Sequence, residues 1–159
     1  FMSWSYHPTY STMSLTEANT GTATTARFMS AKNLNNWMNT VNTYAYATFT
    51  YNTGFTYYAT SGNNMPYAHK WHRMVQLEGC FKCSTAQTST GTISIGKVPS
   101  GCEPIATVRR VQQGSDQNRF MLIIGTDGTI SVERYGVATN TAIPANAWLN
   151  IACTYISAS

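Results

Sequence analysis

The sequence predicts an all-β domain, built as an antiparallel jelly-roll-like sandwich or barrel and preceded by a short N-terminal helix. Two observations carry this prediction. Runs of strand-forming residues recur at intervals of about ten residues from Asn42 onward, with glycine, proline or asparagine between them. No helical pattern of crossover length separates these runs, so the strands should pair antiparallel.

The first part of the chain lacks a sustained hydrophobic period. Residues 1–29 are rich in Thr, Ser and Ala, which predicts an extended linker or neck segment. Ser30 can cap a helix, and apolar side chains then recur at spacings of three and four up to Val41, which predicts a short helix over residues 30–41. A helix of about three turns is marginal alone in water, so it should dock on the following domain or on its own copies.

Strand patterns fill residues 42–159, which we predict to be one β-sandwich head domain. Two Tyr- and Thr-rich runs come first, and an alternating run from Lys70 to Phe81 follows. This longer run is interpreted as one strand with Trp71 in phase with Val75. The remaining runs are TSTGTISIGKV (88–98), IATVRRV (105–111), RFMLIIG (119–125), TISVER (129–134) and WLNIACTYI (148–156).

The dipeptide Asp127-Gly128 predicts a hairpin with a two-residue turn, because both residues tolerate a positive φ. This register opposes Ile123 to Val132 and turns Met121 and Ile123 toward the core. A strand that is apolar on both faces is normally covered twice, once by its own domain and once by something else. The second apolar face of this strand carries Phe120, Leu122 and Ile124.

Charged residues are scarce, at 10% of the chain, and the net charge is +4. A neutral, polar and aromatic surface is typical of proteins that bind sugars or pack against their own copies. No basic stripe could follow a phosphate backbone, so we expect no nucleic-acid binding. No apolar run of about twenty residues is present, so we expect no membrane insertion. The chain starts with Phe1, not Met, and we expect it to be a fragment of a longer protein.

The four cysteines do not form a metal-binding pattern. An even number would suit two disulfides in a secreted domain, but one CxxC motif without a second is weak evidence for structural zinc. His69 and His72 would face opposite sides of a strand and could not share a metal there. Free thiols, no metal and no cofactor are therefore predicted. The cysteines are Cys80, Cys83, Cys102 and Cys153.

Three segments, taken in order, resemble a known family. The loop VPSGCEP (98–104), the hairpin from Gly125 to Ile130 and the last strand from Trp148 to Tyr155 resemble the C-terminal head domain of phage tail-fibre and baseplate receptor-binding proteins. Upstream, NTGTATTARFMSAKNLNNW (19–37) is similar to the segment that precedes such heads. The chain departs from the family pattern at Glu103, where an arginine is common, and in a Tyr-rich insert over residues 44–67.

The resemblance implies a homotrimeric head that binds host-surface carbohydrate without covalent chemistry. It would sit at the tail tip or fibre of a virion, next to other tail or baseplate proteins. A three-fold assembly would also explain the doubly apolar strand, so we predict a trimer interface at Phe120, Leu122 and Ile124. Each sugar contact could be weak, because many heads on one particle bind together.

Sugar recognition needs aromatic rings for C–H faces and polar groups for hydroxyls. One cluster offers both kinds of group, and a second cluster adds further polar groups. Trp71 is more simply explained as core or interface, because it is in phase with Val75 and Leu77. Asp116 lies in a Gly/Ser loop, where exposure and function often coincide. The first predicted cluster is His69, Trp71, His72 and Arg73, and the second is Asp116, Gln117 and Asn118.

A catalytic function is not expected. Glycoside hydrolysis needs two carboxylates at a defined separation, and nothing in the sequence brings two of Glu78, Glu103 and Asp116 together. No nucleophile elbow, P-loop or HExxH motif is present. Two hypotheses remain: a receptor-binding head with a sugar site, or a structural tail or fibre module whose aromatic surface serves assembly.

Overall fold

The computed structural model describes residue 34, residues 49–59 and residues 65–159. The chain divides into two compact units, Phe1–Thr43 and Tyr44–Ser159. The predicted linker 1–29 and the predicted helix 30–41 lie outside the described residues, apart from Leu34, which is helical. These two element boundaries therefore stay predictions. No helix in the described ranges is long and apolar enough to cross a bilayer.

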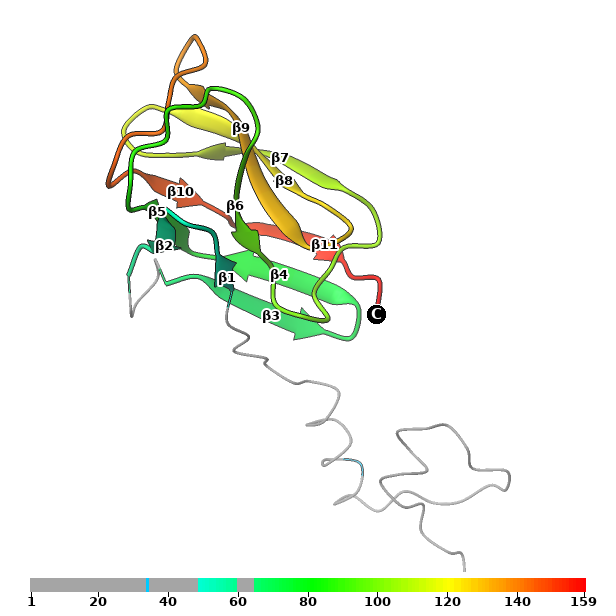
Figure 1. Cartoon of the computed structure of the whole chain (residues 1–159). Helices are drawn as coiled ribbons and strands as arrows, with labels where there is room; N and C mark the ends of the chain where they lie inside the picture. The colour runs from blue at the N-terminus through cyan, green and yellow to red at the C-terminus, as the bar shows by residue number, and fades with distance from the viewer. Residues whose placement is uncertain (1–33, 35–48, 60–64) are drawn as a thin grey trace, which may run out of the picture. The chain divides into compact units, whose positions relative to one another are not determined.

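The second unit is a two-layered β-sandwich whose strands pair antiparallel throughout the described residues, as Figure 1 shows. This arrangement confirms the predicted all-β antiparallel fold. The strands are β1 (Thr50–Tyr51), β2 (Phe55–Tyr57), β3 (Tyr67–Trp71), β4 (Met74–Glu78), β5 (Cys80–Cys83), β6 (Ile93–Lys97), β7 (Val108–Gln113), β8 (Arg119–Ile124), β9 (Thr129–Gly136), β10 (Trp148–Asn150) and β11 (Cys153–Ile156).

One layer is a five-stranded sheet in the order β1-β6-β9-β8-β7. The other consists of two three-stranded sheets, β10-β5-β2 and β11-β4-β3, in which β4 leads into β5 and β10 leads into β11. Gly79 joins β4 to β5 with a φ of 85°, and a Cβ there would lie 2.1 Å from the Met65 carbonyl oxygen. Only glycine fits this bend.

The two layers also meet along the β7 edge. Gly114 forms a bridge with Leu149, and Pro104 forms a bridge with Ser157, so the chain on both sides of β7 follows β10 and β11. Apolar side chains from both layers fill the space between them. Fully buried members of this core are Leu77, Phe81, Ile95, Leu122, Ile124, Ile130, Leu149 and Ile151.

The β8–β9 hairpin has a three-residue loop, so the predicted two-residue turn is wrong. The Gly125 N–H donates to the Thr129 carbonyl oxygen (2.8 Å), and the Gly128 N–H donates to the Gly125 carbonyl oxygen (2.9 Å). Gly128 alone takes the positive φ, at 79°. The Asp127 carboxylate instead accepts hydrogen bonds from the Thr129 N–H (3.0 Å) and hydroxyl (2.6 Å), which favours the longer loop.

The longer loop shifts the register by one residue and therefore exchanges the two faces of β8. Leu122 faces Val132, and Ile124 faces Ile130. Phe120, Leu122 and Ile124 are 2%, 0% and 0% exposed within the single chain. The predicted trimer interface at these three residues is therefore wrong, because atoms of their own chain cover them. The half-buried side chains of this strand lie on its outer face.

The predicted strand over residues 70–81 is interrupted by a hairpin turn. Trp71 pairs with Met74, and His72 between them has a φ of 53°. The residues His72 and Arg73 are not typical of turns, and the hairpin depends on a distant segment. The Ser157 N–H donates to the Arg73 carbonyl oxygen (2.6 Å), and Arg73 Nε donates to the Ser157 carbonyl oxygen (3.1 Å). Trp71 consequently lies opposite Met74, out of the core.

All four cysteines have free thiols. Cys80, Cys83 and Cys102 are buried, and Cys153 is partly buried. Burial raises the pKa of Cys153 to about 11, with a smaller opposing effect from Arg110. These side chains therefore act as small, protonated apolar groups of the sandwich.

Candidate ligand-binding groove

The loop between β7 and β8 carries the predicted residues Asp116, Gln117 and Asn118. It closes on itself, because the Asn118 N–H and Nδ2 both donate to the Ser115 carbonyl oxygen (3.1 and 2.9 Å). The Gly114 N–H in turn donates to the Asn118 carbonyl oxygen (2.9 Å). Asn118 therefore holds the loop together, and its side chain is not offered to a ligand.

The same loop is attached to β10. The Ser115 N–H donates to the Trp148 carbonyl oxygen (3.1 Å), and the Trp148 N–H donates to Ser115 Oγ (2.8 Å). Beneath it lies the buried ring of Tyr135, 2.8 Å from where a Cβ on Gly114 would stand. Burial raises the pKa of Tyr135. The β7–β8 loop is thus a fixed platform on the sandwich.

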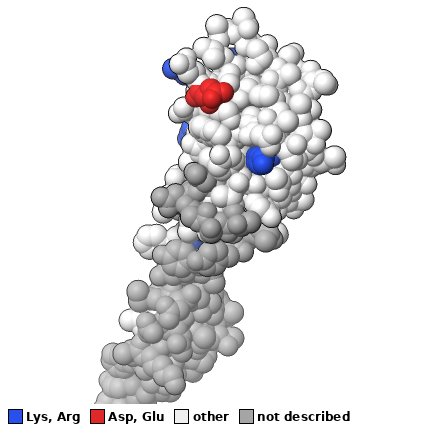
Figure 2. Space-filling view, turned by 90° about the vertical axis from the view of Figure 1, so that its left-hand side faces the viewer, with Lys and Arg blue, Asp and Glu red and all other residues white. Residues whose placement is uncertain are grey.

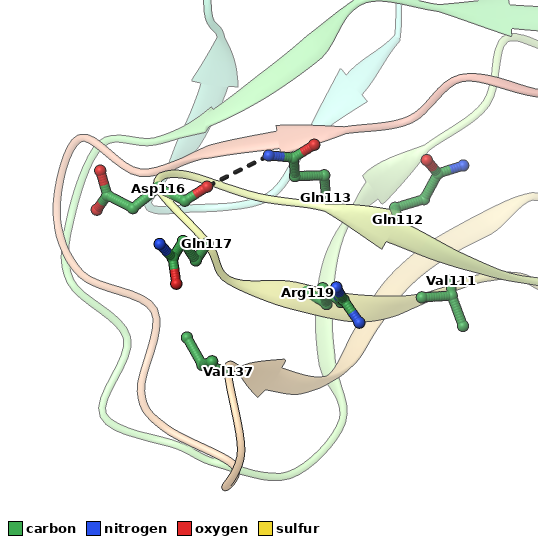
Figure 3. A pocket seen from close by; sticks show the side chains of 7 residues that line it. All are labelled: Val111, Gln112, Gln113, Asp116, Gln117, Arg119 and Val137. Atoms are coloured by element: carbon green, nitrogen blue, oxygen red, sulfur yellow. Dashed lines mark hydrogen bonds between the residues drawn. The ribbon is translucent and has the colours of Figure 1, made fainter.

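A groove of about 530 Å³ lies beside this platform. Figure 3 shows Asp116 and Gln117 at one end, with Arg119 and Val111 further along and Val137 across from them. The two valines are each 67% exposed and give the groove an apolar side. Gln113 Nε2 donates to the Asp116 carbonyl oxygen (3.3 Å). The residues that line the groove are Val111, Gln112, Gln113, Asp116, Gln117, Arg119 and Val137.

A smaller hollow of about 250 Å³ continues the groove under residues 137–140. It shares Val111, Arg119 and Val137 with the groove and adds Arg134. Two non-glycine residues of this region have left-handed backbones, Asp116 with a φ of 58° and Arg134 with a φ of 56°. Such conformations cluster at binding and catalytic sites, so their coincidence here marks the region as a functional candidate.

The surface around the groove carries few charges. Figure 2 turns this side of the domain toward the viewer and shows one small acidic patch and scattered basic groups on an otherwise uncharged surface. The Asp116 carboxylate is exposed and forms no salt bridge within the described residues. It is therefore available as a hydrogen-bond acceptor.

The structure does not bring the two predicted clusters together. His69, Trp71, His72 and Arg73 belong to the β3–β4 hairpin, which lies at the opposite end of the domain from the β7–β8 loop (Figure 1). Leu149 pairs beside the loop, whereas Ser157 pairs with Arg73 beside the hairpin. Leu149 and Ser157 are eight positions apart along β10 and β11, so at about 3.3 Å for each extended residue the two ends are separated by up to roughly 25 Å.

The hairpin end carries an exposed apolar row that the sequence did not reveal. Register places Trp71 beside Met74 and Met74 beside Ile156, and the Ile105 N–H donates to the Ile156 carbonyl oxygen (3.0 Å). Their side chains are 56%, 42%, 49% and 59% exposed, in the order Trp71, Met74, Ile156 and Ile105. His69 lies on the same face, with its Nε2 3.9 Å from Glu78 Oε2. We refer to Trp71, Met74, Ile156 and Ile105 as the apolar row.

The three acids considered for glycoside hydrolysis lie in separate parts of the fold. Glu78 accepts a hydrogen bond from Gln76 Nε2 (2.5 Å), and Glu103 accepts one from the Gly101 N–H (2.8 Å). Asp116 stands in the groove. The described residues contain no group of three His, Cys, Asp or Glu side chains that could hold a metal ion.

Sequence reasoning missed Val111, Arg119, Arg134 and Val137. They come from three strands and a loop, and only the pairing of β7, β8 and β9 brings them to one end of the sheet. The exposure of Val111 was also hidden, because it follows a strand pattern that reads as half-buried.

No protein-family model matches the chain, and no curated protein matches it in sequence. Among solved structures, the chain is similar to the receptor-binding protein (gp15) of Listeria phage PSA, with a TM-score of 0.55 and 16% identity. The similarity covers 92% of this chain and 88% of that chain. At this level of identity the similarity concerns the fold. The chain therefore shares its fold with a phage receptor-binding protein.

Proposed function

We propose that this chain is the head of a phage tail-fibre or baseplate receptor-binding protein, which attaches the virion to carbohydrate on the host surface. It acts by binding alone, without catalysis or a cofactor. The observation that carries the proposal is the groove, in which amide and carboxylate groups of β7 and of the fixed β7–β8 loop lie beside two exposed valines. The shared fold supports the phage origin.

The groove has the chemistry that a polyhydroxylated ligand needs. Gln113 and Gln117 can each donate and accept hydrogen bonds, and Asp116 adds an acceptor. The C–H faces of a sugar ring are apolar and can cover Val111 and Val137. The attachment of the loop to β10 keeps these groups in place before the ligand arrives, which lowers the entropy lost on binding.

A homotrimer and contacts with other tail or baseplate proteins are part of this proposal. The buried face of β8 cannot supply the subunit contact, so the apolar row is the surface that we assign to assembly. Three heads on one fibre would bind one cell surface together, and weak sugar contacts would add up to durable attachment.

The test is binding of the full chain to a printed glycan array and to polysaccharide purified from candidate host envelopes. The double variant Asp116→Ala/Gln117→Ala should lose roughly tenfold or more in affinity, since hydrogen bonds to charged groups contribute about 1.5–3 kcal/mol. Thr126→Ala, an exposed change in the β8–β9 loop, is the matched control. Absence of saturable binding by the wild type, or full binding by the double variant, would contradict the proposal.

The apolar row favours a second candidate, a structural tail module that binds no ligand of its own. In that case Trp71 and its neighbours serve assembly only, and recognition belongs to another chain. Glycan binding by Trp71→Ser separates the two. Both candidates expect this variant to form a smaller particle in light scattering, but only a receptor-binding head should still bind glycan.

A further inference from the structure

We propose that Arg119 and Arg134 form a subsite for an anionic group, a phosphate or a carboxylate, carried by the bound glycan. The inference rests on the proposed function and makes it more specific, since it adds a charge requirement to sugar binding. The subsite is the 250 Å³ hollow under residues 137–140, which both arginines line. Because the hollow shares Arg119 with the groove, one ligand can occupy both.

Neither guanidinium is neutralised within the part of the chain that the structure describes. Within the described residues, no Asp or Glu carboxylate forms a salt bridge with Arg119 or Arg134. Glu133 is next to Arg134 in sequence, but its Oε1 accepts a hydrogen bond from the Thr92 hydroxyl (2.6 Å). Two cations that line one small hollow repel each other until an anion binds between them.

The backbone of β9 supplies a second, independent observation. Arg119 pairs with Gly136 and Met121 pairs with Glu133, so two residues of β9 stand opposite Phe120 alone. Arg134 is one of these two and has a φ of 56°, a conformation that glycine adopts at much lower cost. Bulges of this kind often redirect a side chain beside a binding site. An arginine therefore occupies a position at which the backbone conformation favours glycine.

Arginine suits an anionic ligand better than a neutral one. Its planar guanidinium donates two parallel hydrogen bonds to a carboxylate or a phosphate, and these bonds are roughly twice as strong as neutral ones. Neutral hydroxyls would be served by the amides and the carboxylate of the adjoining groove. The arrangement predicts a ligand with hydroxyl groups at one end and a negative charge at the other.

The test uses the full chain on an array of neutral, uronate-bearing and phosphate-bearing glycans. Wild type should bind charged glycans, and Arg119→Gln and Arg134→Gly should each weaken that binding roughly tenfold, as expected for one charge-assisted pair. Arg134→Gly should not lower the melting temperature, because glycine fits the left-handed position, so a binding loss cannot come from misfolding. Arg110→Gln removes the same charge from β7 outside both hollows and is the matched control.

The outcomes separate this inference from the function on which it rests. Preference for uronates or for phosphates, lost in both variants and kept in the control, supports the subsite and identifies the anion. Binding of neutral glycans that neither variant changes overturns the subsite and leaves the proposed function standing. An equal loss in Arg110→Gln also overturns it, since general charge then explains the binding. A wild type that binds no glycan overturns both.

Discussion

The hydroxyl of Tyr155 donates a hydrogen bond of 2.7 Å to the carbonyl oxygen of Cys102. This bond joins the last strand to the loop between β6 and β7, which the sequence resemblance had singled out. Lys70 Nζ binds the same loop through the Gly101 carbonyl oxygen (2.6 Å). The Glu103 carboxylate accepts a hydrogen bond from the Gly101 N–H inside the loop. The loop is therefore a structural connection between the two layers.

Replacing Tyr155 with Phe should destabilise the domain by about 1–3 kcal/mol, because the buried Cys102 carbonyl oxygen loses its donor. Burial also raises the pKa of Tyr155, so the protonated hydroxyl favours the folded state. This contribution is complete below the pKa of an unfolded tyrosine, about 10, and is lost as the pH rises above it. Urea unfolding at neutral and alkaline pH measures both effects. Tyr57→Phe, at an exposed position, should leave stability unchanged.

Arg73→Met should destabilise the β3–β4 hairpin by about 1 kcal/mol, because the hydrogen bond from Arg73 Nε to the Ser157 carbonyl oxygen is lost. Hydrogen exchange should then increase selectively at the ends of β3, β4 and β11. Arg110→Met is a suitable control, since Arg110 is exposed and its bonded neighbour is the adjacent residue. If exchange at these strand ends is the same in Arg73→Met as in Arg110→Met, the hairpin does not depend on the C-terminal residues.

The sequence predicted the strands well because a period of two is a local property. It predicted the β8–β9 register wrongly because one side chain, Asp127, decides between a two- and a three-residue loop. The β3–β4 turn was missed because Ser157, far away in sequence, holds it. Loop composition identified Asp116 and Gln117 as candidates. Arg134 could not be identified, since its position depends on a bulge that only the pairing with β8 creates.

Asp127→Ala should lower the melting temperature, because both hydrogen bonds to Thr129 are lost from the β8–β9 loop. These bonds lower the pKa of Asp127. A lowered pKa stabilises the fold above the pKa of an unfolded aspartate, about 3.9, and this contribution is lost as the pH falls below it. Thermal melts from neutral to acidic pH should thus show a smaller acid effect in Asp127→Ala than in the wild type. Asp116→Ala, which lacks such bonds, should keep the full acid effect.

Leu122→Ala should destabilise the domain by about 2–5 kcal/mol, as expected for a fully buried leucine whose removal leaves a cavity. Because Leu122 lies in the core of one chain, the loss should be the same at every protein concentration. Stability that comes from an interface would instead rise with concentration by mass action. Trp71→Ser is the counterpart, because it should change only the concentration dependence that assembly produces. Urea midpoints over a wide range of protein concentration measure both effects. If the loss of stability in Leu122→Ala depends on protein concentration, β8 does contribute to a subunit interface.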